Sequence, residues 1–177
     1  VAVCYKDGPM DNIVNIDGWT TGPSNYIMIW VPPGQRHTGT KGTGFVVKPI
    51  TSAPGTWYFV FTIREDYVRI EGVEIDGSSV TNGQTLAGIK TYSTASDIRV
   101  DKCLIHDFTN TAYAAVVSVD GISHTNGSIR ITNTIIYNMK ATPTSSVNAA
   151  RGIDISSSST TNYVYNNTVY NVTDTGS

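Results

Sequence analysis

Charged side chains are scarce in this chain. Asp, Glu, Lys and Arg make up 15% of its 177 residues, and the net charge is −2. A chain so close to neutral lacks the basic footprint of a nucleic-acid-binding protein and the basic patch of a membrane-surface protein. No apolar run approaches the roughly 20 residues that cross a bilayer. We therefore expect no nucleic-acid partner, no membrane insertion and a single domain over residues 1–177.

Cysteine is almost as rare. Cys4 and Cys103 are too few for a disulfide framework, and the sequence leaves open whether they pair. Cys103 lies among apolar residues, where a buried free thiol is common. Abundant Thr, Ser, Asn and Gly are typical of secreted β-rich proteins, and three glycosylation sequons agree with export. We expect an extracellular location or one on a cell or virion surface.

A sustained 3.6-residue apolar period is absent as well. Apolar residues alternate in short bursts, as in Val68-x-Ile70 and Ile98-x-Val100, which is the period of a strand with one buried face. Gly and Pro punctuate the gaps, as in Pro32-Pro33-Gly34, and forbid long helices there. The chain is predicted to be all-β.

The sequence also repeats itself. Four segments, 67–75, 97–105, 128–136 and 162–170, each consist of a strand, a two-residue corner and another strand. They recur at spacings of 30, 31 and 34 residues, and constant strands with variable loops are typical of a solenoid. We expect the first apolar residue of each unit to lie in one inward column, which consists of Val68, Ile98, Ile129 and Tyr163.

The second corner residue is Gly72, Lys102, Asn133 or Asn167 in the successive units. Gly and Asn accept a left-handed backbone most cheaply, so Lys102 does not fit the pattern. Stacked Asn side chains can hydrogen-bond to the coils above and below, and we expect Asn133 and Asn167 to begin such a ladder. Gly72, Asn133 and Asn167 are therefore interpreted as structural residues.

A further strand precedes each unit, over 59–63, 88–92, 116–120 and 152–156. In this pattern residues 57–174 resemble the right-handed parallel β-helix superfamily, which includes pectate lyases, polygalacturonases and viral tailspikes. The resemblance implies a right-handed parallel β-helix of about five coils with three short strands per coil. Residues 1–31 would form the first coil and 57–177 the regular coils, and the loop over 32–56 would be either a flap packed on the side or a contact surface.

The resemblance to pectate lyases implies a site on the outward face of the first strand of each coil. There, acidic residues hold calcium, and a cationic residue removes a proton next to a carboxylate. Lys90, Asp154 and Arg151 are the candidate catalytic residues. The outward column is expected to contain Thr62, Lys90, Ser118 and Asp154, with Asp120 and Arg151 nearby. This is too sparse for calcium, which takes six to eight oxygens, so we expect no cofactor and no metal.

Other catalytic patterns are missing. The motifs of polygalacturonases do not occur, and no pair of carboxylates suits a glycosidase. His106 and Asp107 are neighbours in a strand, so their side chains should point to opposite faces, and His106 is expected at the surface. Sugar binding remains open, because aromatic rings can stack on sugars as well as fill a core. The candidate ligand-binding residues are Tyr92, Tyr113, His124 and Asp120.

The third strands are apolar on both faces, because Leu104 and Ile135 alternate with Ile105 and Ile136. The second face needs a cover, either a loop of this chain or a neighbouring subunit. The two ends of the sequence show no capping segment over their strands. Leu104 and Ile135 are therefore the candidate assembly residues.

These observations favour an extracellular, non-catalytic structural or adhesive module that associates with copies of itself, as a filament or a closed oligomer. The first alternative is a polysaccharide lyase or hydrolase, or a fragment of one, with a polysaccharide as its partner. The second is a glycan-binding protein similar to viral tailspikes. A cluster of outward carboxylates would distinguish an enzyme from a structural module, and the sequence pattern reveals none.

Overall fold

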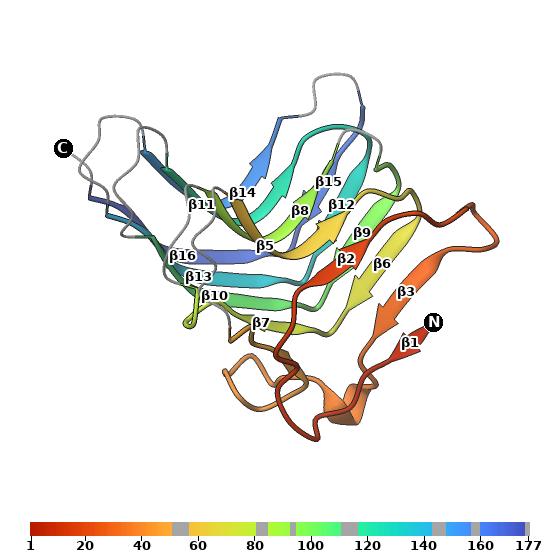
Figure 1. Ribbon diagram of the computed structural model, residues 1–177, viewed down its shortest axis with the longest axis horizontal. Coiled ribbons are helices and arrows are strands. Elements are labelled where there is room, and N and C mark those ends of the chain that lie inside the picture. Colours follow the sequence, from red (N-terminus) through yellow and green to blue (C-terminus); the bar gives the residue numbers. More distant parts are fainter. Residues whose placement is uncertain are drawn as a thin grey trace.

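Three parallel sheets stack around one core as a β-solenoid of about five turns (Figure 1). In this computed structural model the described residues are 1–50, 57–80, 85–92, 95–110, 117–142, 148–156 and 160–175. Each full coil contributes one strand to each sheet, which confirms the predicted solenoid with three strands per coil. Within the described ranges, no helix is long and apolar enough to cross a membrane.

Sheet A contains six strands in the order β1 (Ala2–Val3), β3 (Ile27–Trp30), β6 (Val68–Glu71), β9 (Ile98–Asp101), β12 (Ile129–Thr132) and β15 (Tyr163–Tyr165). Sheet B contains β4 (Val46–Val47), β7 (Glu74–Asp76), β10 (Leu104–Asn110), β13 (Ile135–Ala141) and β16 (Thr168–Asp174). Sheet C contains β2 (Val14–Ile16), β5 (Trp57–Ile63), β8 (Thr85–Thr91), β11 (Val117–His124) and β14 (Asn148–Ile155). A short 3-10 helix, η1 (Pro33–Gln35), precedes β4.

The predicted inward column of sheet A is confirmed for its first three residues. Val68, Ile98 and Ile129 are at most 1% exposed. The fourth is a correction: Tyr163 pairs with Arg130 rather than with Ile129, so it faces outward and is 49% exposed. The alignment of the last repeat slips by one residue, because Asn162 takes the rung next to Ile129, whose backbone N–H donates to the Asn162 side chain at 3.0 Å.

The same slip corrects the corner between sheets A and B. Gly72, Lys102, Asn133 and Asn166 have φ of 79°, 52°, 51° and 56°, so Asn166 rather than Asn167 takes the left-handed position, and Lys102 adopts it too. Asn166 donates to the Asn133 side chain, which donates to Asp101 at 2.7 Å, and this forms the expected ladder. Asn167 instead spans two coils, accepting from the Thr134 backbone N–H and donating to the Ile131 carbonyl, both at 2.9 Å.

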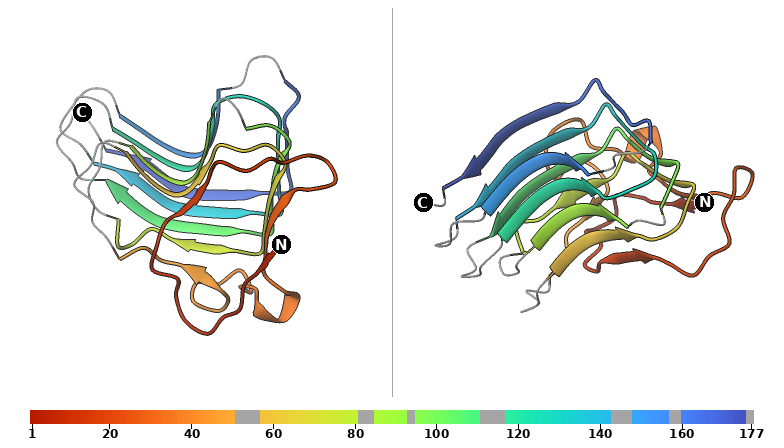
Figure 2. Two further views of the ribbon diagram at one scale, coloured as in Figure 1. Left: turned by 45° about the vertical axis from the view of Figure 1, so that its right-hand side comes forward. Right: turned by 90° about the horizontal axis from the view of Figure 1, so that it is seen from above.

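Sheet C bends where its register skips a residue. Val60, Gly88, Gly121 and Gly152 have no partner in the strand register, and the residue after each of them also faces the core. The glycines are required because a Cβ on Gly121 would lie 2.5 Å from the Gly152 carbonyl oxygen and from Ile136. Figure 2 shows the result: sheet C is a curved trough whose concave side faces away from sheet B.

Residues 32–50, called the flap below, include the edge strand β4 of sheet B, and the segment before β4 runs over the outer face of that sheet. His37 contacts the Lys102 carbonyl at 2.8 Å, and the backbone N–H of Gly42 donates to Glu74 at 2.8 Å. Leu104 is fully buried, and Ile135 is half-buried beside Gly39. The chain's own loop therefore covers this face, which corrects the expectation that Leu104 presents an apolar surface to a neighbour.

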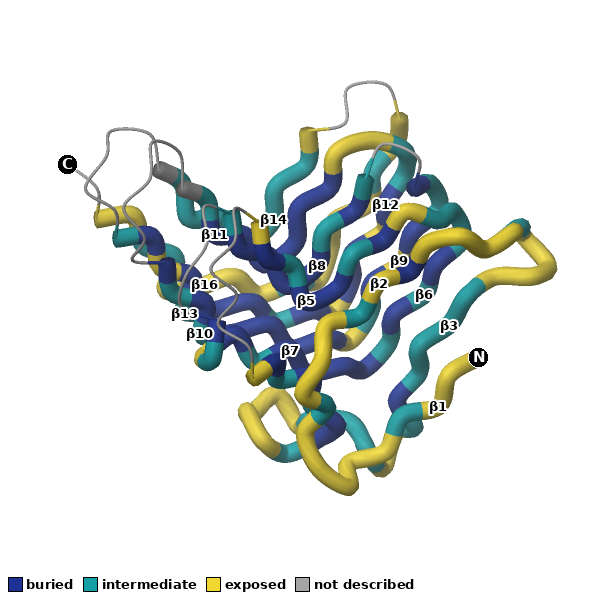
Figure 3. The backbone as a smooth tube through the Cα atoms, viewed as in Figure 1, coloured by how far each residue is buried: buried dark blue, intermediate teal, exposed yellow. Residues whose placement is uncertain are grey.

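Burial is greatest in the middle coils and weakest in the first and last ones (Figure 3). In the last coil, Val164 and Val169 pair with the buried Ile131 and Ile136, yet each is 45% exposed. Both cysteines are free, so the possible bond between Cys4 and Cys103 is absent.

Replacing Gly121 tests the role of the glycine row, which consists of Gly88, Gly121 and Gly152. Gly121→Ala should lower the free energy of unfolding by about 1–3 kcal/mol or more, because the new methyl group overlaps a backbone oxygen and a packed isoleucine. Gly34→Ala is the matched control, since no atom lies within 4 Å of its added Cβ. Urea unfolding of both variants measures the difference, and equal stabilities would mean that the bend does not need glycine.

Candidate functional site

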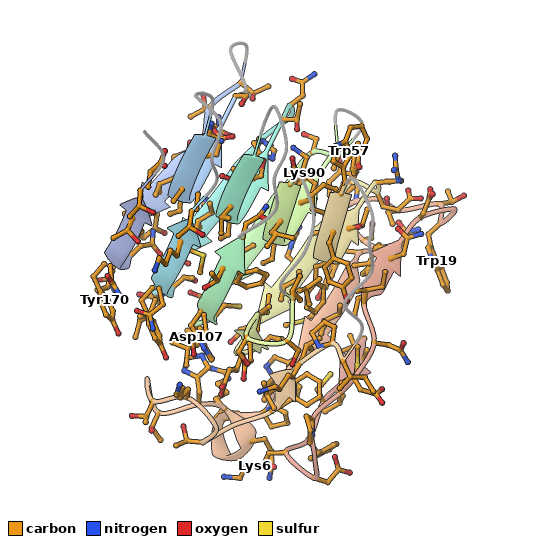
Figure 4. All side chains as sticks on the ribbon, turned by 60° about the vertical axis from the view of Figure 1, so that its left-hand side comes forward. Lys6, Trp19, Trp57, Lys90, Asp107 and Tyr170 are labelled. Atoms are coloured by element: carbon orange, nitrogen blue, oxygen red, sulfur yellow. The ribbon has the colours of Figure 1, made fainter. Side chains whose placement is uncertain are left out.

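A cluster of charged residues lies on the concave outer face of sheet C. Lys90 comes from β8, Asp120 from β11, and Arg151 and Asp154 from β14, so three successive coils contribute. Asp120 pairs with Arg151 in the strand register, and Lys90 shares a row with Ser123 and Asp154. We call these four charged residues the sheet C cluster. Figure 4 shows Lys90 among the sheet C strands, well away from Asp107 on sheet B.

The bend brings the four side chains together. The positions on either side of the two consecutive inward residues point outward, on the concave side of the bend. One nitrogen of Arg151, Nη1, donates to Asp120 Oδ1 and to Asp154 Oδ2, both at 3.2 Å. Lys90 Nζ donates to Ser123 Oγ at 3.0 Å and to Thr125 Oγ1 at 2.8 Å.

Burial pushes two of these groups toward their uncharged forms. Asp120 is 1% exposed, and burial raises the pKa of its carboxyl to about 6, against the lowering effect of the Arg151 charge. Burial also lowers the pKa of the Lys90 ammonium, although the charges of Asp120 and Asp154 act in the opposite direction. A carboxyl whose pKa is raised and an ammonium whose pKa is lowered, in the same cluster, are a candidate acid and base.

The sequence-predicted residues fall into three groups. The structure brings together Lys90, Asp120, Arg151 and Asp154. Tyr92 borders this cluster, because its ring lies 3.8 Å from the Arg64 guanidinium and 6.0 Å from Lys90 Nζ. Tyr113 lies outside the described residues.

Two assignments in this region are corrected. His124 is fully buried in the core side of β11, where its ring nitrogens lie 2.6 Å from Thr91 Oγ1 and 3.0 Å from the Gly127 carbonyl oxygen. Its role is structural rather than ligand-binding. Ser118 is not in the row of Lys90; Ser123 is, because the strand predicted over 116–120 extends to His124 and pairs with β8 further along than the predicted alignment.

A second polar cluster lies beneath the flap and corrects the placement of His106. This side chain faces outward from sheet B but is fully buried, 3.1 Å from Glu74 Oε1 and 3.1 Å from Asp107 Oδ2. Asp107 has a φ of 60°, and this left-handed backbone brings two sequence neighbours to the same side. Burial alone would lower the pKa of His106, but its hydrogen bonds to Glu74 and Asp107 raise it overall.

Ligand atoms of Asp76, His106 and Asp107 lie within 4.8 Å of one another, a geometry that a metal ion could share. Lysines of the flap already neutralise the two aspartates: Lys48 contacts Asp76 at 2.9 Å and Lys41 contacts Asp107 at 3.1 Å. We therefore interpret this group as the anchor of the flap. At the sheet C cluster the described residues offer two carboxylates, whose oxygens are fewer than the six to eight oxygen ligands that calcium takes.

No protein family matches this chain, and no match was found among curated proteins or among solved structures. The sheet C cluster therefore stands on its own geometry. Sequence reasoning named all four of its residues but missed that Asp120 and Asp154 share one arginine. The available signal was the Gly88, Gly121 and Gly152 row, which marks a bend in each strand of the sheet.

The pKa of Asp120 should respond to its two neighbours in opposite directions. Arg151→Met should raise the pKa of Asp120 above about 6, and Asp154→Asn should lower it, because the first change removes a positive charge and the second a negative one. Carbon-13 NMR of the aspartate carboxyl carbons across the pH range measures both shifts. Lys140→Met removes an exposed charge from sheet B and should leave the titration unchanged.

The same titration has a consequence for stability. A carboxyl whose pKa is higher in the folded state than its ordinary value of 3.8 binds protons more tightly when folded. Relative to Asp120→Asn, the unmodified protein should therefore lose stability as the pH rises from about 4 to about 6. If the stability difference between the two proteins is independent of pH in this window, the Asp120 carboxyl is not perturbed.

Proposed function

We propose that this solenoid binds an acidic polysaccharide along the outer face of sheet C and cleaves it by β-elimination. The observation that supports this most directly is the pairing of opposite shifts within the sheet C cluster. The pKa of the Lys90 amine is lowered and that of the Asp120 carboxyl is raised to about 6. An amine whose pKa is lowered and a carboxyl whose pKa is raised are the candidate base and acid for the two proton transfers that an elimination needs.

Lys90 is the proposed base. Its uncharged Nζ removes the proton on the carbon next to the sugar carboxylate. The electron pair of that C–H bond forms a carbon–carbon double bond as the bond to the glycosidic oxygen breaks. Ser123 and Thr125 position the amine by accepting hydrogen bonds from Nζ. Burial lowers the pKa of this amine, which makes it a better base near neutral pH than a fully solvated lysine.

Asp120 is the proposed acid, and it gives its proton to the departing glycosidic oxygen. The transfers balance: Lys90 gains one proton, Asp120 loses one, and exchange with water restores both. Arg151 is the proposed carboxylate-binding group, because its side chain is 41% exposed and its guanidinium offers donors in addition to the nitrogen shared by the two aspartates. Asp154 is a positioning residue that orients Arg151.

Cleavage is tested with polygalacturonate, alginate and neutral pullulan as substrates. The expected result is unsaturated product, detected by its ultraviolet absorption, from one of the acidic polymers alone. Lys90→Ala and Asp120→Asn should each reduce kcat about a hundredfold or more, whereas Lys140→Ala should have no effect. Reducing ends without the ultraviolet band would assign the cluster to hydrolysis, and no products from any polymer would remove the enzymatic proposal.

A second candidate function is self-association, which is favoured by the last coil. Val164 and Val169 point toward the interior of the stack but are 45% exposed, and β14, β15 and β16 are each the edge strand of their sheet. An unpaired strand edge above exposed apolar side chains is a surface on which another coil can dock. Docking of a coil from a second copy would give the filament or oligomer expected from the sequence.

Light scattering at increasing protein concentration measures this association. Val164→Lys should abolish it, because the charge would enter the apolar cross-section of the stack. Tyr163→Lys is the matched control: it lies next to Val164 in the same strand with a similar exposure of 49%, but faces outward. A monomer of the unmodified protein at every concentration would contradict this function.

A further inference from the structure

Three arginines form a ladder on the outer face of sheet A. Arg69, Arg99 and Arg130 occupy the same position in β6, β9 and β12, with Arg69 paired to Arg99 and Arg99 paired to Arg130. Neighbouring strands are about 4.8 Å apart, so three positive charges stack at that spacing. Like charges placed directly opposite each other destabilise a sheet, and a bound anion would relieve this repulsion.

The chain itself supplies little of that negative charge. Arg69 donates to Asp97 Oδ2 at 2.5 Å, and Arg99 donates to Oδ1 of the same carboxylate at 3.2 Å. Arg130 is exposed, packs its guanidinium 4.9 Å from the Tyr163 ring, and makes no ion pair with any residue that the structure describes. One carboxylate thus serves two of the three guanidinium groups.

The other acidic side chains nearby are already neutralised. Glu71 contacts Arg36 at 2.6 Å and Lys102 at 3.5 Å. Asp101 contacts Lys102 and accepts from Thr132 and Asn133, both at 2.7 Å. Neither carboxylate pairs with the arginine ladder in the described structure, so the ladder keeps an excess of positive charge.

A groove with a volume of about 550 Å³ runs along this face. The residues that line it combine cations, aromatic rings and uncharged polar groups: Tyr26, Arg69, Arg99, Arg130, Thr132 and Tyr165. The two tyrosines flank the arginines, because Tyr26 precedes β3 and Tyr165 ends β15. They are 43% and 51% exposed, which leaves their rings open to a ligand.

We propose that this groove binds an acidic polysaccharide that lies across the strands of sheet A, with its carboxylate or sulfate groups on the arginine ladder. A guanidinium matches such anions with two parallel hydrogen bonds, and tyrosine rings stack on the apolar faces of sugars. The repeat of one cation per coil suits a polymer with regularly spaced charges. The groove lies on a different sheet from the sheet C cluster and uses none of its residues, so it binds whether or not that cluster cleaves.

The acidic members of the lining favour a glycan over a nucleic acid. Glu71 and Asp101 also border the groove. Their carboxylates can accept hydrogen bonds from the free hydroxyl groups of a glycan, which a DNA chain lacks. We therefore assign the groove to an acidic glycan.

Binding is tested by calorimetry with polygalacturonate and chondroitin sulfate as probes, neutral pullulan as the uncharged arm, and single-stranded oligo(dT) as the nucleic-acid arm. One of the two acidic glycans should bind, with an affinity that falls as salt increases. Arg130→Ala should raise its Kd about tenfold and the Arg99→Ala/Arg130→Ala variant about a hundredfold. Both side chains are exposed, so neither change should disturb folding, and thermal melts verify this.

Lys140→Ala is the matched control, because it removes an exposed positive charge from the neighbouring strand of the same coil and should leave Kd unchanged. Lys90→Ala should abolish any cleavage without changing binding to this groove, which separates the two proposals. Three results would overturn the inference: equal Kd for the arginine variants and the unmodified protein, tighter binding of oligo(dT) than of either glycan, or an equal loss with Lys140→Ala.

Discussion

The hydrogen-bonded register between successive coils is the constraint from which the other features follow. Each residue in a strand lies about 4.8 Å from the residue one coil away, although roughly 31 positions separate them in sequence. A side chain repeated at the coil period therefore becomes a continuous column. The core, the asparagine ladders, the glycine row and the arginine ladder are all columns of this kind. Each column is stabilised or strained by the contacts between equivalent side chains of successive coils.

Stacking has opposite consequences for different residues. The second asparagine ladder runs from Asn171 to Asn138 at 2.5 Å and from Asn138 to Asp107 at 2.6 Å, so the amide of Asn138 both donates and accepts. An amide column satisfies itself in this way, and it permits the left-handed backbone at all three positions. A column of arginines cannot satisfy itself because guanidinium groups only donate. For this reason we interpret the asparagine ladders as structural and propose a ligand for the arginine ladder.

The two polar clusters depend on departures from regular strands. In sheet C, two consecutive inward residues break the alternation, and the resulting trough gathers Asp120, Arg151 and Asp154 around one nitrogen. In sheet B, the left-handed Asp107 turns its side chain toward His106, which is fully buried beneath the flap. Burial raises the pKa of Asp120, whereas the hydrogen bonds of His106 raise its pKa against the lowering effect of burial. Both polar clusters thus lie where the regular alternation of inward and outward residues is interrupted.

The sequence by itself determined the solenoid, its three strands per coil and the inward column of Val68, Ile98 and Ile129, because apolar alternation at a fixed repeat length admits one way to bury those faces. It also pointed to Lys90, Asp120, Arg151 and Asp154 as the residues with chemistry to offer. Only the tertiary structure decided that Tyr163 faces outward, that Asn166 rather than Asn167 takes the corner, and that His124 and His106 are buried. These outcomes depend on one-residue register shifts and on a flap from a distant part of the chain. A one-residue shift moves a side chain to the opposite face of the sheet, yet it leaves unchanged the local sequence pattern from which that face was predicted.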